Sequence, residues 1–426
     1  MAVHPPALSE LSEALCFVFL LLIPAAAAGL ALVNAGLGRF RNAAHAMLSA
    51  LCVIATAALV YFAVGAAWQG SAGQAAYAWR VGGREWNWIG AGRFFLRGVD
   101  SGGWSSLAAL FGLLAVGLAA IIPLGSGADR WRLGASCAST VLLAGWTYPL
   151  FAHWAWGGGW LAQLGFLDSG GASVIQVVGG LTALSITWIL GPRRGKFSPE
   201  GMPSALPGHN AVLVLLGCFL ALAGWLGLNS AGAILFTGVE ASRVVLIAIN
   251  TVLSAGSAAL AAAVITRARF GKTDASLCAN GWIAGLAAVS AGCAVIRPAA
   301  GVIVGLIAGA LVVYSVEWLE LRLGVDDPGG SVSVHAVAGL WGLLAAGFLG
   351  AVAPGDAPRL WLVQLVGIAT LLGFILPVTY GLNWLLNRIA PQRVAVEGER
   401  QGLDLYELGA GAYPDLQTHN EDFWQR

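Results

Sequence analysis

The sequence predicts an all-α integral membrane protein with eleven membrane-spanning helices. Hydrophobic residues make up 58% of its 426 residues and charged residues only 10%, whereas a soluble domain usually carries about 25% charged residues. Its 59 glycines and 18 tryptophans fit a membrane bundle, because glycine lets helices approach closely and tryptophan favours the membrane interface. Apolar segments long enough to cross a bilayer recur along the chain. They must be helices, because open strands would leave backbone groups unpaired in lipid.

Eleven apolar segments, taken in order, are expected to cross the membrane. The chain has no Lys or Arg before Arg39, so its first segment lacks the basic region of a secretory signal and is interpreted as a retained span. Cleavage after the small-residue run PAAAAG is the alternative. Residues 1–388 then form the membrane domain and the polar residues 389–426 a cytoplasmic tail. The expected spans are 12–37, 45–68, 104–125, 133–153, 172–191, 210–230, 240–266, 274–295, 299–322, 332–353 and 360–387.

The distribution of basic residues predicts the orientation of the chain. Fifteen of the 22 Lys and Arg residues lie in the tail or in the connections after spans 1, 3, 5, 7 and 9. Basic residues concentrate on the cytoplasmic side of a membrane. We therefore expect a multi-pass protein of the plasma membrane with its N-terminus outside and its C-terminus in the cytoplasm.

One motif occurs twice. DSGGASVIQVVGGL runs from Asp168 to Leu181, and DPGGSVSVHAVAGL runs from Asp327 to Leu340. Five spans separate the copies, and an odd number of spans turns the second half upside down. The pattern therefore predicts inverted five-helix repeats, spans 1–5 and 6–10, with an eleventh helix added, an arrangement that places a binding site between the repeats.

The two copies differ at one polar position, where Gln176 in the first stands opposite His335 in the second. Each lies eight residues after the aspartate that opens its span, about 12 Å along a helix, so the two side chains approach the bilayer centre from opposite faces. A polar side chain at that depth indicates a functional site. The alternative for His335 is a core histidine bonded to a backbone carbonyl. The aspartates are expected to cap their helices.

Several classes of function have no support in the sequence. The net charge of +1 suggests no nucleic-acid partner, and the six cysteines form neither a CxxC pair nor a metal spacing. No nucleophile–base pair and no glycine-rich phosphate loop is visible. We therefore expect no enzyme activity, no metal and no cofactor.

Four stretches resemble the ammonium transporter family (Amt, Mep and Rh proteins). DPGGSVSVHAVAGLWGLLAAG is similar to its tenth-span signature and WGGGWLAQLGFLDSGGASVIQVVGGL to the signature leading into its fifth span. GWLGLNSAG resembles its sixth-span motif, and GLDLYELGAGAYPD resembles its cytoplasmic tail. The matches lie in order along essentially the whole chain.

The resemblance implies a homotrimer in membrane lipid, with a narrow pore between the repeats of each protomer. In this family ammonium is recruited at an outer aromatic site, loses its water below stacked phenylalanines and passes two facing histidines. By resemblance, Trp156 is the outer aromatic residue, a role suited to cation–π binding, although a membrane-interface residue is the alternative. The other residues carried over are Asp168 as the capping aspartate, His335 as the second pore histidine and Trp225 in the sixth-span motif.

Five positions depart from the family pattern. The first pore histidine is Gln176, which cannot take a proton near neutral pH, so a proton relay through both sites would be interrupted. Losing one ring of the phenylalanine gate would widen the constriction of the pore and weaken the selectivity of the pore for its substrate. The outer gate phenylalanines fall at Phe111 and Ala115, the other gate phenylalanine at Leu228, the outer-site serine at Gly232 and an acidic residue of the tenth span at Gly330.

The expected function is membrane transport of ammonium or ammonia, with methylammonium as a further substrate. The alternatives are an ammonium sensor that conducts little and a neutral-gas channel of Rh type. The tail is expected to pack beneath the pores and couple protomers, and the cytoplasmic face to meet a P-II-type signalling protein. Arg193, Arg194 and Lys196 are candidate docking residues, although a positive-inside loop explains them equally well.

Overall fold

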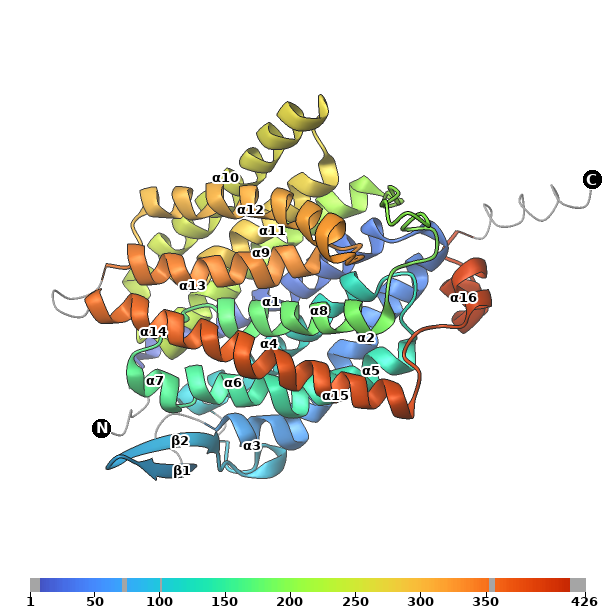
Figure 1. Ribbon diagram of the computed structural model, residues 1–426. Coiled ribbons are helices and arrows are strands. Elements are labelled where there is room, and N and C mark those ends of the chain that lie inside the picture. Colours follow the sequence, from blue (N-terminus) through green and yellow to red (C-terminus); the bar gives the residue numbers. More distant parts are fainter. Residues whose placement is uncertain (1–7, 71–74, 100–101, 352–356, 414–426) are drawn as a thin grey trace, which may run out of the picture.

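The computed structural model describes residues 8–70, 75–99, 102–351 and 357–413, and it is a bundle of long helices (Figure 1). Eleven helical runs cross the bundle within these residues. They are α1 (Glu10–Leu37), α2–η2–α3 (Ala43–Val60, Tyr61–Gly65, Ala66–Gln69), α4 (Gly103–Gly127), α5–η4–α6 (Leu133–Leu142, Leu143–Thr147, Tyr148–Ala155), η5–α8 (Ala172–Val177, Val178–Leu190), α9 (Ala211–Phe236), α10 (Val244–Phe270), α11 (Ala275–Val289), α12 (Pro298–Leu323), η7–α13 (Val332–Val337, Ala338–Leu349) and α14–η8–α15 (Ala357–Thr370, Leu371–Ile375, Leu376–Ile389).

The predicted helical membrane architecture is confirmed. Nine of these runs are long and apolar enough to cross a membrane. The remaining two are α5–η4–α6, which is less apolar, and α11, which is shorter but apolar. Five of the runs contain a π-helical turn, a local widening that recurs at functional sites.

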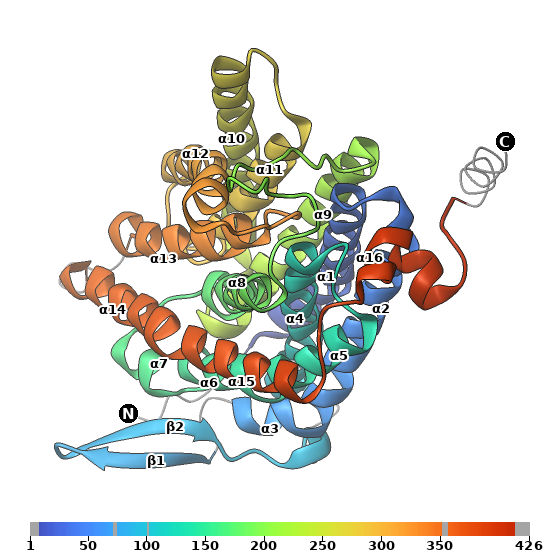
Figure 2. The same cartoon turned by 45° about the vertical axis from the view of Figure 1, so that its right-hand side comes forward.

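A β-hairpin, which the sequence analysis did not predict, joins the second and third runs. Strands β1 (Ala76–Val81) and β2 (Arg84–Gly90) pair antiparallel around Gly82 and Gly83, which both adopt positive φ. Such a two-residue turn suits the twist of paired strands. Figures 1 and 2 place the hairpin beside α6 and α7 (Trp160–Leu164). We call this end of the bundle the hairpin end.

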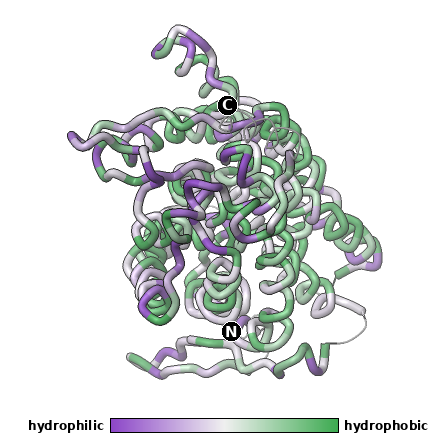
Figure 3. Tube along the Cα trace, turned by 90° about the vertical axis from the view of Figure 1, so that its right-hand side faces the viewer, coloured by the Kyte–Doolittle hydropathy of each residue, from purple (hydrophilic) through white to green (hydrophobic). Residues whose placement is uncertain are grey.

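The opposite end, which we call the tail end, carries the last described residues of the chain. After α15 the chain forms α16 (Val396–Gln401) and η9 (Asp404–Leu408), and η9 lies against the start of α2. Figure 3 views the bundle from this end and shows hydrophilic connections in front of largely hydrophobic helices.

The first helices of the two halves, α1 and α9, pack antiparallel with the same contact made twice. A methyl group added at Gly29 would lie 2.6 Å from the backbone nitrogen of Ala221, and one added at Gly224 would clash with the backbone of Ala26. If Asn34 corresponds to Asn229, Gly29 corresponds to Gly224 and Ala26 to Ala221. The two contacts are therefore related by a pseudo-twofold axis, as inverted repeats require.

The fifth and tenth runs show the same symmetry. A methyl group at Gly180 would clash with the backbone nitrogen of Ala336, and one at Gly339 would lie 2.7 Å from Cγ2 of Val177. Gly180 corresponds to Gly339 and Val177 to Ala336 in the duplicated motif. Glycine is needed at these places because a side chain would collide with the facing helix.

Buried ion pairs join the two halves at the tail end. Arg193, which follows α8, grips Asp326 with two hydrogen bonds (Nε–Oδ2 2.9 Å and Nη2–Oδ1 3.0 Å) and reaches Asp129 Oδ2 at 3.0 Å. Burial alone would raise the pKa of Asp326, but the bonds from Arg193 and the charge of Arg130 outweigh it and hold that pKa below its ordinary value. Burial lowers the pKa of Arg130 to about 10.

The tail is tied to this junction and to α2. Arg41 donates to the carbonyl oxygens of Glu399 and Arg400 (3.0 and 2.7 Å). Asp404 accepts the backbone N–H of His45 at 2.7 Å, and the His45 ring lies 2.8 Å from Glu407. The tail is therefore docked through charges rather than through a broad apolar face.

Two of the three basic residues expected to be available to a signalling partner are not. Arg193 is buried in the ion pairs just described, and Lys196 is buried with Nζ 2.6 Å from Glu320 Oε1. Arg194 alone of the three is exposed. The interpretation of all three as docking residues is therefore wrong, because internal carboxylates already pair two of them.

Candidate functional site

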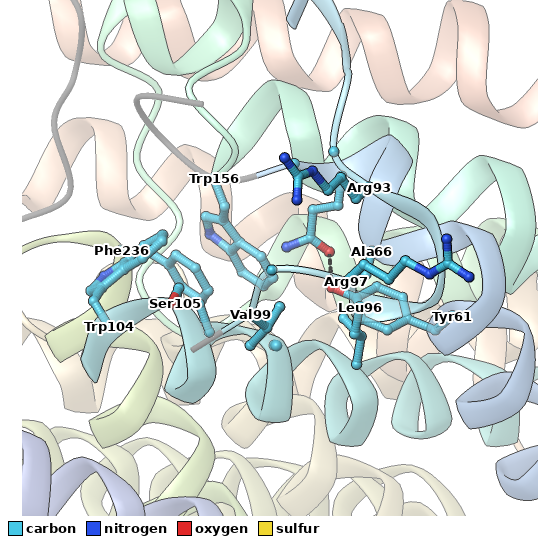
Figure 4. Close-up of a pocket in the computed structure, with 16 residues that line it drawn as sticks. Tyr61, Ala66, Arg93, Leu96, Arg97, Val99, Trp104, Ser105, Trp156 and Phe236 are labelled. Carbon is cyan, nitrogen blue, oxygen red and sulfur yellow. Dashed lines mark hydrogen bonds between the residues drawn. The ribbon is translucent and has the colours of Figure 1, made fainter. Parts of the chain in front are cut away.

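A cavity of about 60 Å³ opens at the hairpin end (Figure 4). Its walls come from η2 and α3, from the connection after β2, from the start of α4 and from the ends of α6 and α9. We call it the outer cavity. Its lining includes Tyr61, Gln69, Trp104, Ser105, Trp156 and Phe236.

Two stacked rings line the outer cavity, and a third ring packs edge-on behind them. Trp156 lies parallel to Phe236, with centroids 4.3 Å apart and planes 4° apart. Phe111 stands edge-on to both rings, at 5.6 Å from Trp156 and 5.1 Å from Phe236. Trp156 is fixed by its Nε1–H, which donates to the carbonyl oxygen of Asp168 at 2.7 Å. The rings form an apolar barrier that a guest must displace or pass.

Phe236 is the member of this stack that the sequence analysis missed. It is the last residue of α9, seven positions after Asn229 of the sixth-span motif and therefore about two turns along the same face. Its ring packs where Phe111 and Trp156 meet, so a second phenyl group lies beside Phe111 although Ala115 supplies none. An aromatic residue at this helical spacing was the available signal.

Polar groups line the remaining wall of the outer cavity. The Tyr61 hydroxyl donates to Gln69 Oε1 at 2.7 Å, a bond drawn dashed in Figure 4. Trp104 donates its Nε1–H to the carbonyl oxygen of Leu235 at 3.0 Å and so fixes its ring against the end of α9. The cavity therefore offers aromatic faces and a phenol–amide pair to a small guest.

The Asp168 carboxylate caps the start of η5 and does not line the outer cavity as described. It accepts a hydrogen bond from the Ser173 hydroxyl and four from backbone N–H groups, an arrangement that stabilises both the anion and the orphan donors of a helix start. The four donors are Gly171 at 2.9 Å, Ala172 at 2.8 Å, Ser173 at 2.8 Å and Val174 at 3.2 Å.

Its counterpart Asp327 repeats this arrangement at the other end of the bundle. It accepts the N–H groups of Ser331 (3.0 Å) and Val332 (2.7 Å) and the hydroxyl of Ser126 (2.7 Å). The motif is thus duplicated in its hydrogen bonds as well as in its residues.

Gln176 and His335 meet inside the bundle. His335 Nδ1 lies 2.7 Å from Gln176 Oε1, and the side chains are 4% and 0% exposed. An amide oxygen only accepts hydrogen bonds, so Nδ1 carries the proton and Nε2 is left with a free lone pair. The other amide atom, Gln176 Nε2, is buried without a partner among the described residues. The pair therefore leaves two groups free to bind a guest: His335 Nε2 as a hydrogen-bond acceptor and Gln176 Nε2 as a donor.

The remaining predicted site residues pack in the surroundings. Phe111, Ala115, Trp225 and Leu228 are completely buried, and none of them is among the described residues that line the outer cavity. Trp225 Nε1 has no hydrogen-bond partner in the described part of the chain.

Two of the departures from the family pattern have steric reasons. A side chain at Gly232 would clash with the carbonyl oxygen of Ser169, so no serine fits there without a shift of the backbone. Gly330 has a φ of +67° and lies against the Asn280 amide, so only glycine fits without strain.

Comparisons with known proteins agree with this architecture. The family model described as Ammonium Transporter Family matches residues 14–413. Ammonium transporter Amt2 of Archaeoglobus fulgidus is 34% identical over 91% of this chain and 85% of its own length, and the ammonium transporter of Bacillus subtilis is 32% identical over 91% and 94%.

Solved structures resemble the whole bundle. One described as a sensor Amt protein has a TM-score of 0.86 at 26% identity and covers 93% of this chain and 98% of its own. Mep2 of Candida albicans has a TM-score of 0.81 at 22% identity, covers 92% of this chain and 88% of its own, and at that identity shows the fold alone. Because the family model spans nearly all the described residues and two transporters exceed 30% identity, this chain belongs to the ammonium transporter family.

Proposed function

We propose that this protein moves ammonium or ammonia across a membrane through a pore between its two inverted halves. The observation that carries the proposal is the hydrogen-bonded pair of Gln176 and His335, buried where the fifth and tenth runs cross. Polar side chains at that depth are costly and are kept for a guest or an ion. The relatives from Archaeoglobus fulgidus and Bacillus subtilis are named ammonium transporters.

The path starts at the outer cavity and ends at the tail end. Aromatic faces and the Tyr61–Gln69 pair suit a small cation that has lost part of its water. The stack of Trp156, Phe236 and Phe111 then separates the cavity from the buried pair. There the free lone pair of His335 Nε2 accepts a hydrogen bond from ammonia or ammonium, and Gln176 Nε2 donates one.

Gln176 limits what the pore does with protons. A glutamine amide neither accepts nor releases a proton near neutral pH, so only His335 of the pair titrates. We therefore infer net passage of uncharged ammonia, or a much reduced charge per molecule moved, compared with a pore that has two facing histidines.

A sensor that binds ammonium and conducts little is the second candidate. It is favoured by one observation, the likeness at 26% identity to a structure described as a sensor Amt protein. The two candidates differ in flux, which is rapid and saturable for a transporter and near the level of empty vesicles for a sensor.

Uptake of labelled methylammonium into proteoliposomes tests the proposal. We expect flux well above protein-free vesicles and about a tenfold fall for Trp156→Leu, because the outer stack loses its fixed central ring. Trp188→Leu is the matched control, since Trp188 lies on α8 with its side chain 46% exposed. Wild-type flux no higher than that of empty vesicles would exclude transport.

We also infer the setting of the molecule. Because most basic residues lie at the tail end, that end faces the cytoplasm and the hairpin end faces outward from the plasma membrane. The polar residues 389–426 form a cytoplasmic tail of a membrane domain at 1–388, although residues 1–7 and 414–426 lie outside the described residues. The family resemblance supports a homotrimer and a P-II-type partner near Arg194. Native mass spectrometry in detergent should give three chains per particle.

A further inference from the structure

Two arginines stand at the mouth of the outer cavity. Arg93 and Arg97 line it, both are exposed, and Figure 4 places them on the side of Tyr61, opposite Trp104 and Phe236. No Asp or Glu occurs among the described residues that line this cavity. The described lining of the cavity is therefore net positive, which is unexpected at an entrance for a cation, because like charges repel.

The arginines are held there by a constrained loop. Between them, Phe95 and Leu96 have φ values of 61° and 51°, left-handed conformations that are strained for residues other than glycine. Strain of this kind persists only when the surroundings enforce it, and it gathers at functional sites. Here Phe94 packs edge-on to Trp68 at 5.4 Å and Phe95 edge-on to Phe62 at 5.8 Å.

We propose that Arg93 and Arg97 form an electrostatic rim that lowers the occupancy of the outer cavity by ammonium. The rim thereby sets the apparent affinity of uptake and makes it depend on ionic strength in the direction opposite to that of a negatively charged mouth. The proposal deepens the proposed function and rests on it, because a rim matters for uptake only if the cavity is the entrance.

The size of the effect follows from Coulomb's law. Two unit charges on the order of 8 Å from a cation in water lower its local concentration about fivefold without salt, and roughly twofold near 0.15 M salt, where the Debye length is about 8 Å. Raising the salt concentration from near zero to 0.15 M should therefore lower the apparent KM for methylammonium by about 2.5-fold, which is the ratio of these two factors.

The first experiment measures the potential without relying on transport. Ser105, which is half-buried in the cavity wall, is replaced by cysteine in the full-length chain, and its reaction rates with a cationic and an anionic methanethiosulfonate reagent are compared at low ionic strength. We expect Arg93→Gln with Arg97→Gln to raise the cationic-to-anionic rate ratio at least threefold. A cysteine at Ser242, away from the cavity, should show an unchanged ratio.

The second experiment measures uptake. The Arg93→Gln and Arg97→Gln double variant should lower the apparent KM for methylammonium several-fold at low ionic strength and remove its salt dependence. The matched control is Arg80→Gln with Arg84→Gln, the same charge change on the exposed hairpin outside the cavity.

Each outcome decides a different point. An unchanged rate ratio at the Ser105 position, or a control double variant that shifts KM equally, overturns the rim. A salt effect that follows the identity of the anion at constant ionic strength also overturns it, since screening does not distinguish anions. If no variant takes up methylammonium, the proposed transport function is excluded. The ratio of cationic to anionic reaction rates at the Ser105 position would still report whether the two arginines make the cavity mouth positive.

Discussion

At the scale of single residues, the hydrogen bond between Gln176 and His335 shows how a glutamine occupies the place where the family resemblance implies a second histidine. The amide oxygen occupies His335 Nδ1 and fixes the tautomer, which a second neutral histidine would also do. What the amide does not reproduce is titration. The difference between the two side chains is therefore expected in charge movement rather than in folding.

The substitution Gln176→His tests this difference. A second imidazole restores two titratable groups in contact, so the charge moved per methylammonium should rise from near zero toward one, while uptake changes less than about threefold. Current on a supported membrane and labelled uptake are measured on the same vesicles.

Gln176→Asn is the control, because its shorter amide loses the contact with His335 and gains no titratable group. The same ratio of current to uptake in Gln176→His and in the unchanged chain would refute the link between position 176 and proton movement.

At the scale of helices, glycines let the two halves pack closely against each other. Gly180 and Gly339 occupy equivalent places in the symmetric contact between the fifth and tenth runs. Lipid tails are as apolar as leucine, so membrane helices gain from tight packing more than from the hydrophobic effect. The position of the buried Gln176–His335 pair therefore depends on glycine at both places, because any side chain at Gly180 or Gly339 would push the two helices apart.

Gly180→Ala should therefore destabilise the bundle by about 1–3 kcal/mol, the usual cost of overpacking. Gly381→Ala on α15 is the control, since nothing lies within 4 Å of its added methyl group. That variant should be neutral or slightly stabilising, because alanine favours a helix. Thermal unfolding in detergent measures both, and equal midpoints would contradict the packing argument.

The helices were predictable from sequence and their connections were not. Long apolar runs locate membrane spans because the bilayer sets their length, and the duplicated aspartate motif placed Gln176 opposite His335. The β-hairpin lies in an aqueous connection where no such length applies, although Gly82 and Gly83 between alternating residues were a signal for it. The sequence did not predict the role of Phe236 in the ring cluster, because that cluster forms only when residues from three different helices pack together.

At the scale of the whole molecule, ion pairs at the tail end hold the two halves and the tail together. Arg193 and Asp326 join the two halves, while Glu407 attaches the tail beside His45. Burial alone would raise the pKa of Glu407, but hydrogen bonds from His45 and the Leu133 N–H, with the charges of His45 and Arg132, lower it below its ordinary value. These contacts at the tail end therefore depend on carboxylates that stay ionised.

This predicts release of the tail in acid. A carboxyl group with a lowered pKa in the folded state stabilises that state above its unfolded pKa of about 4.3, and the contribution disappears as the pH falls through the lowered value. The hydrogen-exchange protection factors of residues 391–413, which correct for the slower intrinsic exchange in acid, should be high at pH 7 and fall below about pH 4.

Glu407→Gln should already accelerate that exchange several-fold at pH 7, because the ionised acceptor is lost. Glu397→Gln is the control, since Glu397 is exposed on α16. Equal exchange rates in the two variants would show that Glu407 does not hold the tail.

The crossing of the fifth and tenth runs also bears on how the chain is made. Gln176 and His335 are 159 residues apart, so a ribosome adding about 5–20 residues per second makes the second partner roughly 8 to 30 s after the first. During that interval the glycine face and the lone amide of the early half have no protein neighbour. The nascent protein must wait half-built in the bilayer, and its yield in a cell is then governed by how well that unfinished intermediate is sheltered during insertion.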